Sequence, residues 1–587
     1  MTPTISLAFF LLVPLAAGAG ARSQSEENVL ATYDLRRVMP RWDASPSWSQ
    51  TLLVPPAVNP RDESIVSLDN ALEYGELASF ELLDLLTQVL GDELRREGRE
   101  LMVEGHVLTV LAPESLHEQV RSILEGLELA LSGTVPVRVD VLTLSEAGGE
   151  LPPAGTLPEG EVAKQVSALL ARGAQHQSFV LELSAGRTAR ADAFQRIPFL
   201  FDFDVEIAQS MVIFDPVMSE TRDGTRIALR GLPKAGGLWL STLFLRSDLL
   251  GEIAKKPLEL RGSINHLEKG ASEVVQGPAD IQSPKILVRG LAFDTFLPDG
   301  QGLALTLESS LGGARTREVV FLRRLGGAMS PYVVRPIPRT SRTLIALDAE
   351  LFRAPRLSSL ADPRHDPATG AAQPNLVARF DGEVSGFLLE WMKARFSVWR
   401  RFGPWILIVT DPLWDRDAAA HLDRLVKSLR PATTLHDVTV ELRAQGREGP
   451  SPVRMRVPVL AGSTAGFVMG RGETAVTGYS VEVAQGASVP DPYVSAVFEG
   501  LTLALCVEGK ICEASGMAQL FDAAFAVIDP GYSVLGPIER PEPRVLRFDE
   551  RLVLLAGRPG PVRIGSGSER PDQPGLVLEI TVSPAQR

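Results

Sequence analysis

The 587-residue chain is poor in the residue types from which enzyme sites, metal sites and nucleic-acid surfaces are built. It has two cysteines, seven histidines and a net charge of −13, and no run of clustered Lys and Arg that could follow a phosphate backbone. No Walker lysine loop, no GxGxxG motif opening a helix and no GxSxG elbow occurs. We therefore expect no catalytic residue, no cofactor, no metal and no nucleic-acid partner.

Long apolar runs are also missing, except at the N-terminus. Residues 5–15 are apolar, and the small residues that follow contain two overlapping Ala-x-Ala patterns ending at Ala19 and Ala21. This pattern is typical of a secretory signal peptide, which predicts cleavage near Ala19 or Ala21 and export of the chain. The alternative is an uncleaved membrane anchor, for which the run is short against the roughly 20 residues of a span.

The two cysteines, Cys506 and Cys512, flank a plausible hairpin loop at 508–510. An exported protein reaches an oxidising compartment, so we expect a disulfide across the two strands. The alternative is a pair of buried thiols. No histidine pair lies near them in the sequence, which disfavours a metal site.

Two further groups resemble functional motifs without completing them. His117-Glu118 lacks the second histidine of a zincin helix, so we expect His117 at the surface. Asp411, Asp415 and Asp417 lack the mid-loop glycine and the final glutamate of a calcium loop. We interpret these three as acidic residues at a helix N-terminus, where the helix dipole favours them.

What the sequence does contain is a repeat. Residues 204–229 and 480–505 align without a gap at an offset of 276 residues, with ten of 26 positions identical. At the same offset, Gly186-x-Thr-Ala matches Gly462-x-Thr-Ala. The repeat divides the protein into two halves.

The repeated positions are candidates for a shared pocket or for structural roles. Glu206 and Glu482 are the most suggestive carboxylates, and the alternative is a repeated cross-strand or turn-anchoring hydrogen bond. The Asp-Pro pairs and glycines are interpreted as turns that fix strand register. The remaining repeated structural positions are Gly186, Gln209, Asp215, Pro216, Gly224, Gly462, Gln485, Asp491, Pro492 and Gly500.

Each half begins with a pattern of α-β-β-α-β. In the first half, helices are expected at 77–90 and from Pro113, with strands at 99–103, 106–111 and 137–144. The second half repeats this order, with helices at 384–396 and after Pro412 and strands at 397–400, 405–410 and 438–443. A β-rich stretch follows each unit, in keeping with 51 glycines and 43 prolines.

The expected fold is therefore α+β, with two tandem modules. Its predicted segments are a signal peptide (1–21), a lead-in (22–65), a first α+β unit (66–145), an inserted loop and helix (146–177), a first β-rich domain (178–340), a linker (341–376), a second α+β unit (377–445) and a second β-rich domain (446–587).

The stretch GHVLTVLAPESLHEQVRSILEGLE, Gly105 to Glu128, resembles the ring-forming periplasmic repeat of the bacterial secretins of type II and III secretion and type IV pili. VRVDVLTL (137–144) resembles the strand that leads into the secretin core, and Gly186-x-x-Ala resembles the opening pattern of that core. The resemblance implies a secretin-N-domain-like unit before a secretin-core-like domain. The chain departs from the family in lacking its hallmark Val-Pro and Leu-Gly run, to which 534–538 is the nearest segment.

The resemblance implies a non-enzymatic protein of the periplasm or outer membrane that assembles with copies of itself or with other secretion or envelope proteins. It leaves outer-membrane association open. The alternatives are a soluble periplasmic two-module binding protein without a pore and, more remotely, an unrecognised hydrolase.

Overall fold

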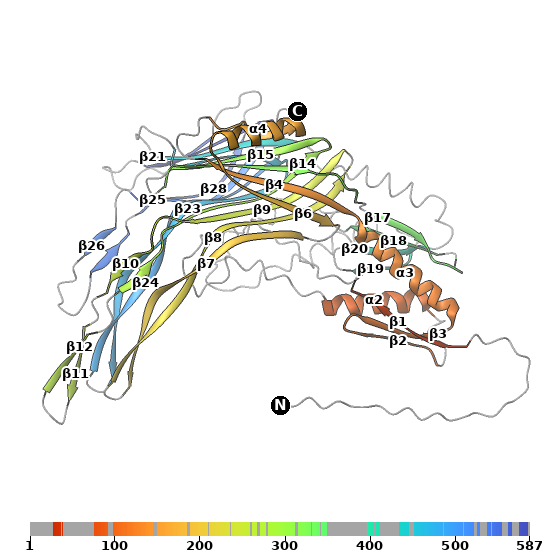
Figure 1. Ribbon diagram of the computed structural model, residues 1–587, viewed down its shortest axis with the longest axis horizontal. Coiled ribbons are helices and arrows are strands. Elements are labelled where there is room, and N and C mark those ends of the chain that lie inside the picture. Colours follow the sequence, from red (N-terminus) through yellow and green to blue (C-terminus); the bar gives the residue numbers. More distant parts are fainter. Residues whose placement is uncertain are drawn as a thin grey trace, which may run out of the picture.

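Two stacked β-sheets form the body of the molecule in the computed structural model (Figure 1). The structure describes residues 27–36, 38, 75–91, 98–144, 150–184, 188–208, 211–234, 236–258, 261–266, 271–276, 280–311, 315–329, 332–340, 342–348, 396–402, 405–410, 434–444, 451–484, 487–508, 510–521, 525–528, 537–541, 543–553, 562–565 and 575–584.

The first sheet, here the long sheet, runs β7-β8-β9-β14-β23-β24-β25-β28, and a hairpin of β11 and β12 joins β24 near its tip. Its neighbouring strands are antiparallel throughout. The strands are β7 (Thr188–Ala208), β8 (Met211–Lys234), β9 (Gly237–Leu249), β11 (Arg261–His266), β12 (Ala271–Gln276), β14 (Ile286–Pro298), β23 (Thr464–Ala484), β24 (Ala487–Glu508), β25 (Ile511–Phe521) and β28 (Pro543–Val553).

The second sheet, here the covering sheet, runs β6-β4-β16-β15-β22-β21-β30-β29, with β5 also beside β15. Its strands are β4 (Thr134–Leu144), β5 (Gly155–Pro158), β6 (Gln175–Ser184), β15 (Gln301–Ser309), β16 (Thr316–Arg324), β21 (Leu435–Ala444), β22 (Val453–Leu460), β29 (Val562–Gly565) and β30 (Leu576–Pro584). Helix α4 (Glu159–Ala171) packs on its outer face (Figure 1).

The main core lies between the two sheets because each strand places alternate residues on one face. In β4, for example, Val135, Val137, Val139 and Val141 all face this core, whereas Leu142 and Leu144 face α4. Burying two such apolar faces against each other gives the stacked architecture.

Two hairpins extend beyond this body. β7 with β8 and β23 with β24 are 20 residues or more in each strand, longer than β9 and β14 between them. Their tips project away from the stacked sheets, beside β11 and β12 (Figure 1). The short pairs β10 (Ala254–Pro257) with β13 (Asp280–Ser283) and β26 (Ala526–Ile528) with β27 (Ile538–Arg540) complete this part.

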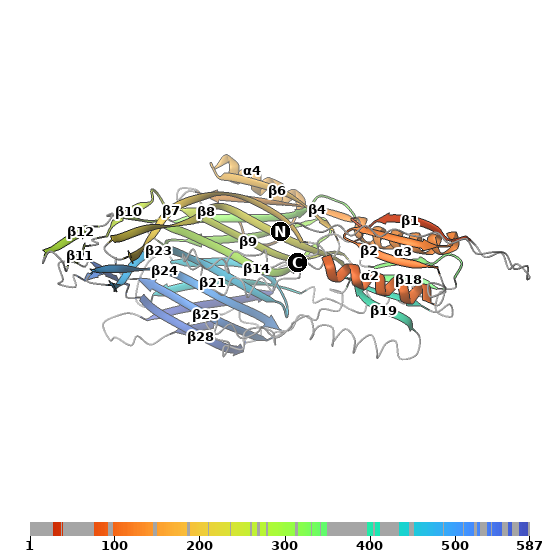
Figure 2. The same ribbon diagram turned by 90° about the horizontal axis from the view of Figure 1, so that it is seen from below.

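A smaller unit lies at the other end of the molecule (Figure 2). It contains a β1-β3-β2 sheet, a β17-β18-β20-β19 sheet and two helices. These elements are β1 (Val29–Asp34), α2 (Gly75–Leu90), β2 (Glu100–Glu104), β3 (Val107–Ala112), α3 (Glu114–Ser132), β17 (Tyr332–Pro336), β18 (Thr343–Asp348), β19 (Phe396–Phe402) and β20 (Trp405–Thr410).

The expected helices and strands of the first α+β unit are present, but one strand belongs elsewhere. β4 pairs with β16 and β6 in the covering sheet, whereas we expected it to close the α+β unit. The place beside β3 is taken by β1 from the lead-in segment. Alternation predicts a strand but carries no information about which strand lies beside it.

The inserted segment contributes to the fold instead of forming only a surface loop. The predicted helix within it is α4, whose Val162, Val166 and Leu169 are buried against the covering sheet. The predicted linker (341–376) is wrong in its first part, because Thr343–Asp348 form β18 of the small unit. The linker after Asp348, the signal peptide, the second-half helices and Asp411, Asp415 and Asp417 lie outside the described residues. No helix in the described ranges has the length and apolarity needed to cross a membrane.

Candidate assembly site: the open edges of two stacked sheets

The two stacked sheets end at the same two sides of the molecule. At one side, β7 of the long sheet lies next to β6 of the covering sheet, and at the other, β28 lies next to β29 and β30. Figure 2 shows β7 and β28 on opposite sides. Among the described strands, β7, β6, β28 and β29 each pair on one side only. An unpaired strand edge presents backbone N–H and C=O groups that another strand can bind.

The two long hairpins have the same register. Thr188 pairs with Arg230 in the first, and Thr464 pairs with Cys506 in the second, so adding 276 to each number converts one register into the other. The irregularities coincide as well, at 200–202 in β7 and 476–478 in β23. Both hairpins therefore twist away from the sheet at the same place.

Corresponding registers also occur in the covering sheet. Thr134 pairs with Ser184 between β4 and β6, and Leu435 pairs with Leu460 between β21 and β22. The offset is 301 residues from β4 to β21 and 276 residues from β6 to β22, and the second value is the offset of the sequence repeat. The order β6-β4-β16-β15 is then followed by β22-β21-β30-β29, with the same internal neighbours.

The repeated glycines Gly224 and Gly500 lie inside strands, which corrects the expectation that they mark turns. Gly224 in β8 has φ +137°, and Gly500 in β24 has φ +151°. A Cβ at Gly224 would overlap the carbonyl oxygen of Ala193, and one at Gly500 would overlap that of Met469. Glycine is required there because the neighbouring strand approaches too closely for a side chain.

The repeated Asp-Pro pairs also lie within strands and not at turns. Asp215 pairs with Asp204, and Asp491 with Ser480, just beyond the irregularity of each hairpin. Asp215 and Pro216 are exposed, whereas Pro492 is buried and Asp491 accepts a hydrogen bond from the Ser480 hydroxyl at 3.3 Å. These prolines follow the irregularity, where the ladder is already interrupted.

The other repeated positions form no common pocket. Glu206 lies exposed in β7 opposite Ile213, and Glu482 lies in β23 opposite Val489. Gly462 has φ +76° in the turn before β23, and its N–H donates to the Val507 carbonyl at 2.7 Å. Gly186, Gln209 and Gln485 lie outside the described residues.

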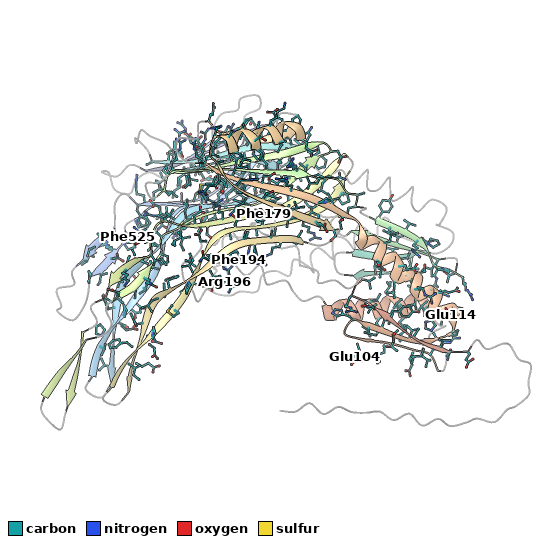
Figure 3. All side chains as sticks on the ribbon, in the orientation of Figure 1. Glu104, Glu114, Phe179, Phe194, Arg196 and Phe525 are labelled. Atoms are coloured by element: carbon teal, nitrogen blue, oxygen red, sulfur yellow. The ribbon has the colours of Figure 1, made fainter. Side chains whose placement is uncertain are left out.

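The open edge of β7 carries charged and apolar groups on the face turned away from the covering sheet. Asp192 is bound by Arg190 and by Arg226, the latter at 2.7 Å from Nε to Oδ1. The Phe194 ring lies 5.1 Å from the Arg222 guanidinium carbon and 5.5 Å from that of Arg226. Phe194 and Arg196 are labelled on β7 in Figure 3.

The other edges carry charges of complementary sign. Arg547 of β28 and Arg563 of β29 are exposed, and Glu182 of β6 is exposed on the opposite side of the molecule. Val545 of β28 and Val180 of β6 are large apolar residues that remain 39% and 58% exposed. Exposed valines on a sheet edge mark a surface suited to contact with another strand.

A buried charge cluster ties the two sheets together in the first half. Arg246 and Arg289 on the long sheet flank Glu318 on the covering sheet, with Arg246 Nη1 at 2.9 Å from Glu318 Oε1. Asp248 contacts both arginines, and Thr143 accepts a hydrogen bond from Arg246 at 2.8 Å. Burial lowers the pKa of Arg289, and the negative charge of Glu318 opposes that shift.

The matching strand registers of the two halves relate each position of this cluster to a position in the second half, and those positions hold apolar residues. The corresponding positions are Ala518, Leu546, Leu520, Leu576 and Ala444, all of them buried in the core between the sheets. Equivalent positions thus hold charged side chains in the first half and apolar side chains in the second. A buried ion group of this kind is weak evidence for stability, because the cost of removing the charges from water offsets their attraction.

The predicted disulfide between Cys506 and Cys512 is wrong. Cys506 pairs with Glu513 and Cys512 with Val507, so the two thiols lie on opposite faces of the hairpin and no disulfide joins them. Glu508 pairs with Ile511, and this register is shifted by one residue from the symmetrical arrangement that a disulfide needs. Burial raises the pKa of Cys512 to about 12.

His117 is buried, contrary to the expectation that it lies at the surface. Its side chain is bonded to the Tyr33 hydroxyl at 2.8 Å and to the Val29 carbonyl at 2.9 Å. Strand β1 covers this side of α3 and supplies both partners. In the described ranges, no three His, Cys, Asp or Glu side chains are grouped so that they could hold a metal ion.

Asp437, near the start of β21, has a carboxyl whose pKa is strongly raised. Burial raises its pKa to about 6, against the opposing charge of Arg456. Its Oδ1 is buried without a hydrogen-bond partner. It lies between β22 and β30, opposite Pro458 on one side and Ser583 on the other.

No protein-family model matches the chain, and no curated protein is detectably similar to it in sequence. The solved structures that are similar to the chain include secretins. The InvG secretin of the Salmonella SPI-1 type III secretion injectisome is 12% identical with a TM-score of 0.20, over 43% of this chain and 79% of that one. GspD, in the pilotin–secretin AspS–GspD complex of ETEC, is 14% identical with a TM-score of 0.20, over 51% of this chain and 75% of that one. Aeromonas hydrophila ExeD is 12% identical with a TM-score of 0.18, over 52% of this chain and 77% of that one. TM-scores this small carry no argument, so the proposals below rest on the strands of this chain.

Sequence reasoning missed the four open edges and the inter-sheet charge cluster. Arg246, Arg289, Asp248 and Glu318 sit in strands of ordinary alternating pattern, and their meeting depends on the stacking of two sheets. The only signal in the sequence was the presence of charged residues at positions where alternation predicts the core.

Proposed function

We propose that this chain is a non-enzymatic exported envelope protein, similar to the secretins of type II and III secretion, that acts through self-assembly or partner docking. Its role would lie in protein secretion or envelope scaffolding, in the periplasm or at the outer membrane. The observation that carries the proposal is that both stacked sheets end in open strand edges on the same two sides. Two sheets that could both be continued by a neighbour favour a wall built from many copies.

The proposal includes two tandem modules, each an α+β unit followed by a β-rich part. Supporting it are the 276-residue offset that relates the registers of the two long hairpins and the irregularity that they share. In the small unit, the hairpins β2–β3 and β19–β20 also end in the same kind of pair, with Glu104 opposite Val107 and Phe402 opposite Trp405. A duplicated module would account for an eight-strand sheet whose two halves have the same order of hairpins.

Light scattering and negative-stain electron microscopy of the native protein, purified from membranes in mild detergent, test this function. We expect a large particle containing many copies. A soluble particle of one chain would overturn the proposal and favour instead a two-module periplasmic binding protein.

A further inference from the structure

One strand pair inside the chain shows how the two open edges of the long sheet could pair with each other between copies. β14 pairs with β9 on one side and with β23 on the other. β28 pairs with β25 as β14 does with β9, but its other side is open. β7 pairs with β8 as β23 does with β24, and its other side is open. The two open edges of the long sheet are therefore the two halves of a junction that the chain makes once within itself.

We propose that β28 of one copy pairs antiparallel with β7 of a second copy of this chain, in the register of the internal β14–β23 junction. This inference rests on the proposed function and specifies its partner and geometry. In that register, the internal pair Gly290–Val468 corresponds to Arg547 opposite Asp192. The pair Val288–Gly470 corresponds to Val545 opposite Phe194.

The transferred register agrees with the faces of the strands. Leu546 and Phe548 face the core between the sheets, and Ala191 of β7 packs against the same core. The register puts Phe548 opposite Ala191, so the apolar faces of the two copies would be continuous. A shift of one residue would turn every side chain of one strand to the wrong face.

The covering sheet supports the same junction independently. β15 pairs with β22 inside the chain, and their counterparts β29 and β6 are the open edges. The pair Thr306–Arg456 corresponds to Gly565 opposite Val180. Continuing this register two residues further places Arg563 opposite Glu182.

In the junction between β29 and β6, the charges of the facing residues are opposite, and the core-facing residues lie opposite each other. Arg563 and Glu182 are both exposed and carry opposite charges. One residue along, Ile564 would lie opposite Leu181, and both face the core between the sheets. Opposite charges directly across an antiparallel pair stabilise it, whereas like charges destabilise it.

Both sheets would thus continue together from copy to copy. Such head-to-tail contacts form a closed ring if the rotation closes. Each chain would contribute two repeated units to the wall, one from each half, joined by its internal junction. The ring would therefore hold twice as many repeated units as chains. The partner is therefore a second copy of this chain, joined at both sheets at once.

Cysteine cross-linking in the full chain tests the register. In a background of Cys506→Ala and Cys512→Ala, one chain carries Asp192→Cys and a co-produced chain carries Arg547→Cys. A second combination uses Glu182→Cys with Arg563→Cys. The matched control is Ala193→Cys with Arg547→Cys, which lies one residue out of register and on the other face.

We expect both in-register combinations to form cross-linked dimers under mild oxidation at least tenfold more than the control. A charge reversal gives a readout independent of the cysteines: Arg563→Glu should reduce assembly, and adding Glu182→Arg should restore it. Particles that form without in-register cross-links, or with stronger links in the control, would overturn the register and leave the proposed function standing. Absence of both particles and cross-links would overturn the two together.

Discussion

Gly224 and Gly500 occupy the same position in two hairpins that are 276 residues apart. Both have positive φ inside a strand, and each lies against the backbone of the neighbouring strand, at Ala193 and Met469 respectively. The irregularity that bends each hairpin lies in the facing strand and nearer the tip, at 200–202 in β7 and 476–478 in β23. These matched positions support the proposed duplication.

We expect Gly224→Ala and Gly500→Ala to destabilise the protein to a similar extent. Each adds a Cβ where backbone already lies and places a side chain at unfavourable φ, which costs about 1–3 kcal/mol or more. Thermal unfolding followed by circular dichroism checks this. Gly160→Ala is the control, because this glycine lies in helix α4 with no atom close to its added Cβ and should gain about 0.5–1 kcal/mol. Loss of stability in the control but not in the strand variants would contradict the account.

The buried charge cluster predicts two opposite results from related substitutions. Glu318→Leu leaves Arg246 and Arg289 buried without their shared carboxylate, and we expect a loss of about 3–5 kcal/mol in the free energy of unfolding.

Replacing the whole cluster by the second half's residues is the matched variant. It combines Arg246→Ala, Arg289→Leu, Asp248→Leu, Glu318→Leu and Thr143→Ala, and we expect it to be neutral or more stable by about 1–4 kcal/mol. Chemical denaturation compares the two. If the single and the combined variants lose equal stability, the cluster does not act as one unit.

The Asp437 carboxyl predicts a dependence of stability on pH. Its pKa in the folded protein is about 6, above its usual value in an unfolded chain. The folded state therefore holds a proton that the unfolded state has lost between about pH 4 and pH 6. Stability falls as pH rises through this window, and above it the buried charge persists as a penalty.

We expect Asp437→Asn to raise the melting temperature at pH 7.5 and to change it little at pH 4. The gain would be about 1 kcal/mol after allowing for solvent screening at this half-buried site. Melting curves of both proteins across this pH range supply the test. A gain that is as large at pH 4 as at pH 7.5 would assign the effect to packing.

The two thiols should behave as separate buried groups. Burial, and a pKa of about 12 for Cys512, predict negligible reaction with a thiol reagent in the folded protein and reaction of two thiols per chain after unfolding. A reducing agent should leave the melting temperature unchanged. A drop in melting temperature on reduction would show that a disulfide forms after all.

Local sequence patterns were sufficient for elements but not for their neighbours. The alternating run at 238–245 lies in β9, and the stripe of Leu116, Val120, Ile123 and Leu127 is the buried face of α3. The position of β4 could not be predicted, because it lies between β6 and β16, and β16 comes from a distant part of the chain. The same is true of His117, which is covered by a strand from the lead-in segment.

Two predictions were wrong because they depended on the position of a turn. Asp223-Gly224 has the composition of a turn, but the positive φ of Gly224 serves a close approach inside a strand. The cysteines are symmetrical about position 509 in the sequence, yet the pair Glu508–Ile511 puts the centre of the hairpin half a residue further on. That small difference reverses the face of one thiol.

The most direct test of the central claim is the symmetry and mass of the native particle, measured together by electron microscopy and light scattering. The account predicts a closed particle in which the repeated wall units number twice the chains, with β28 of each chain against β7 of the next. A particle of a single chain, or a multimer in which these edges stay unpaired, would contradict it.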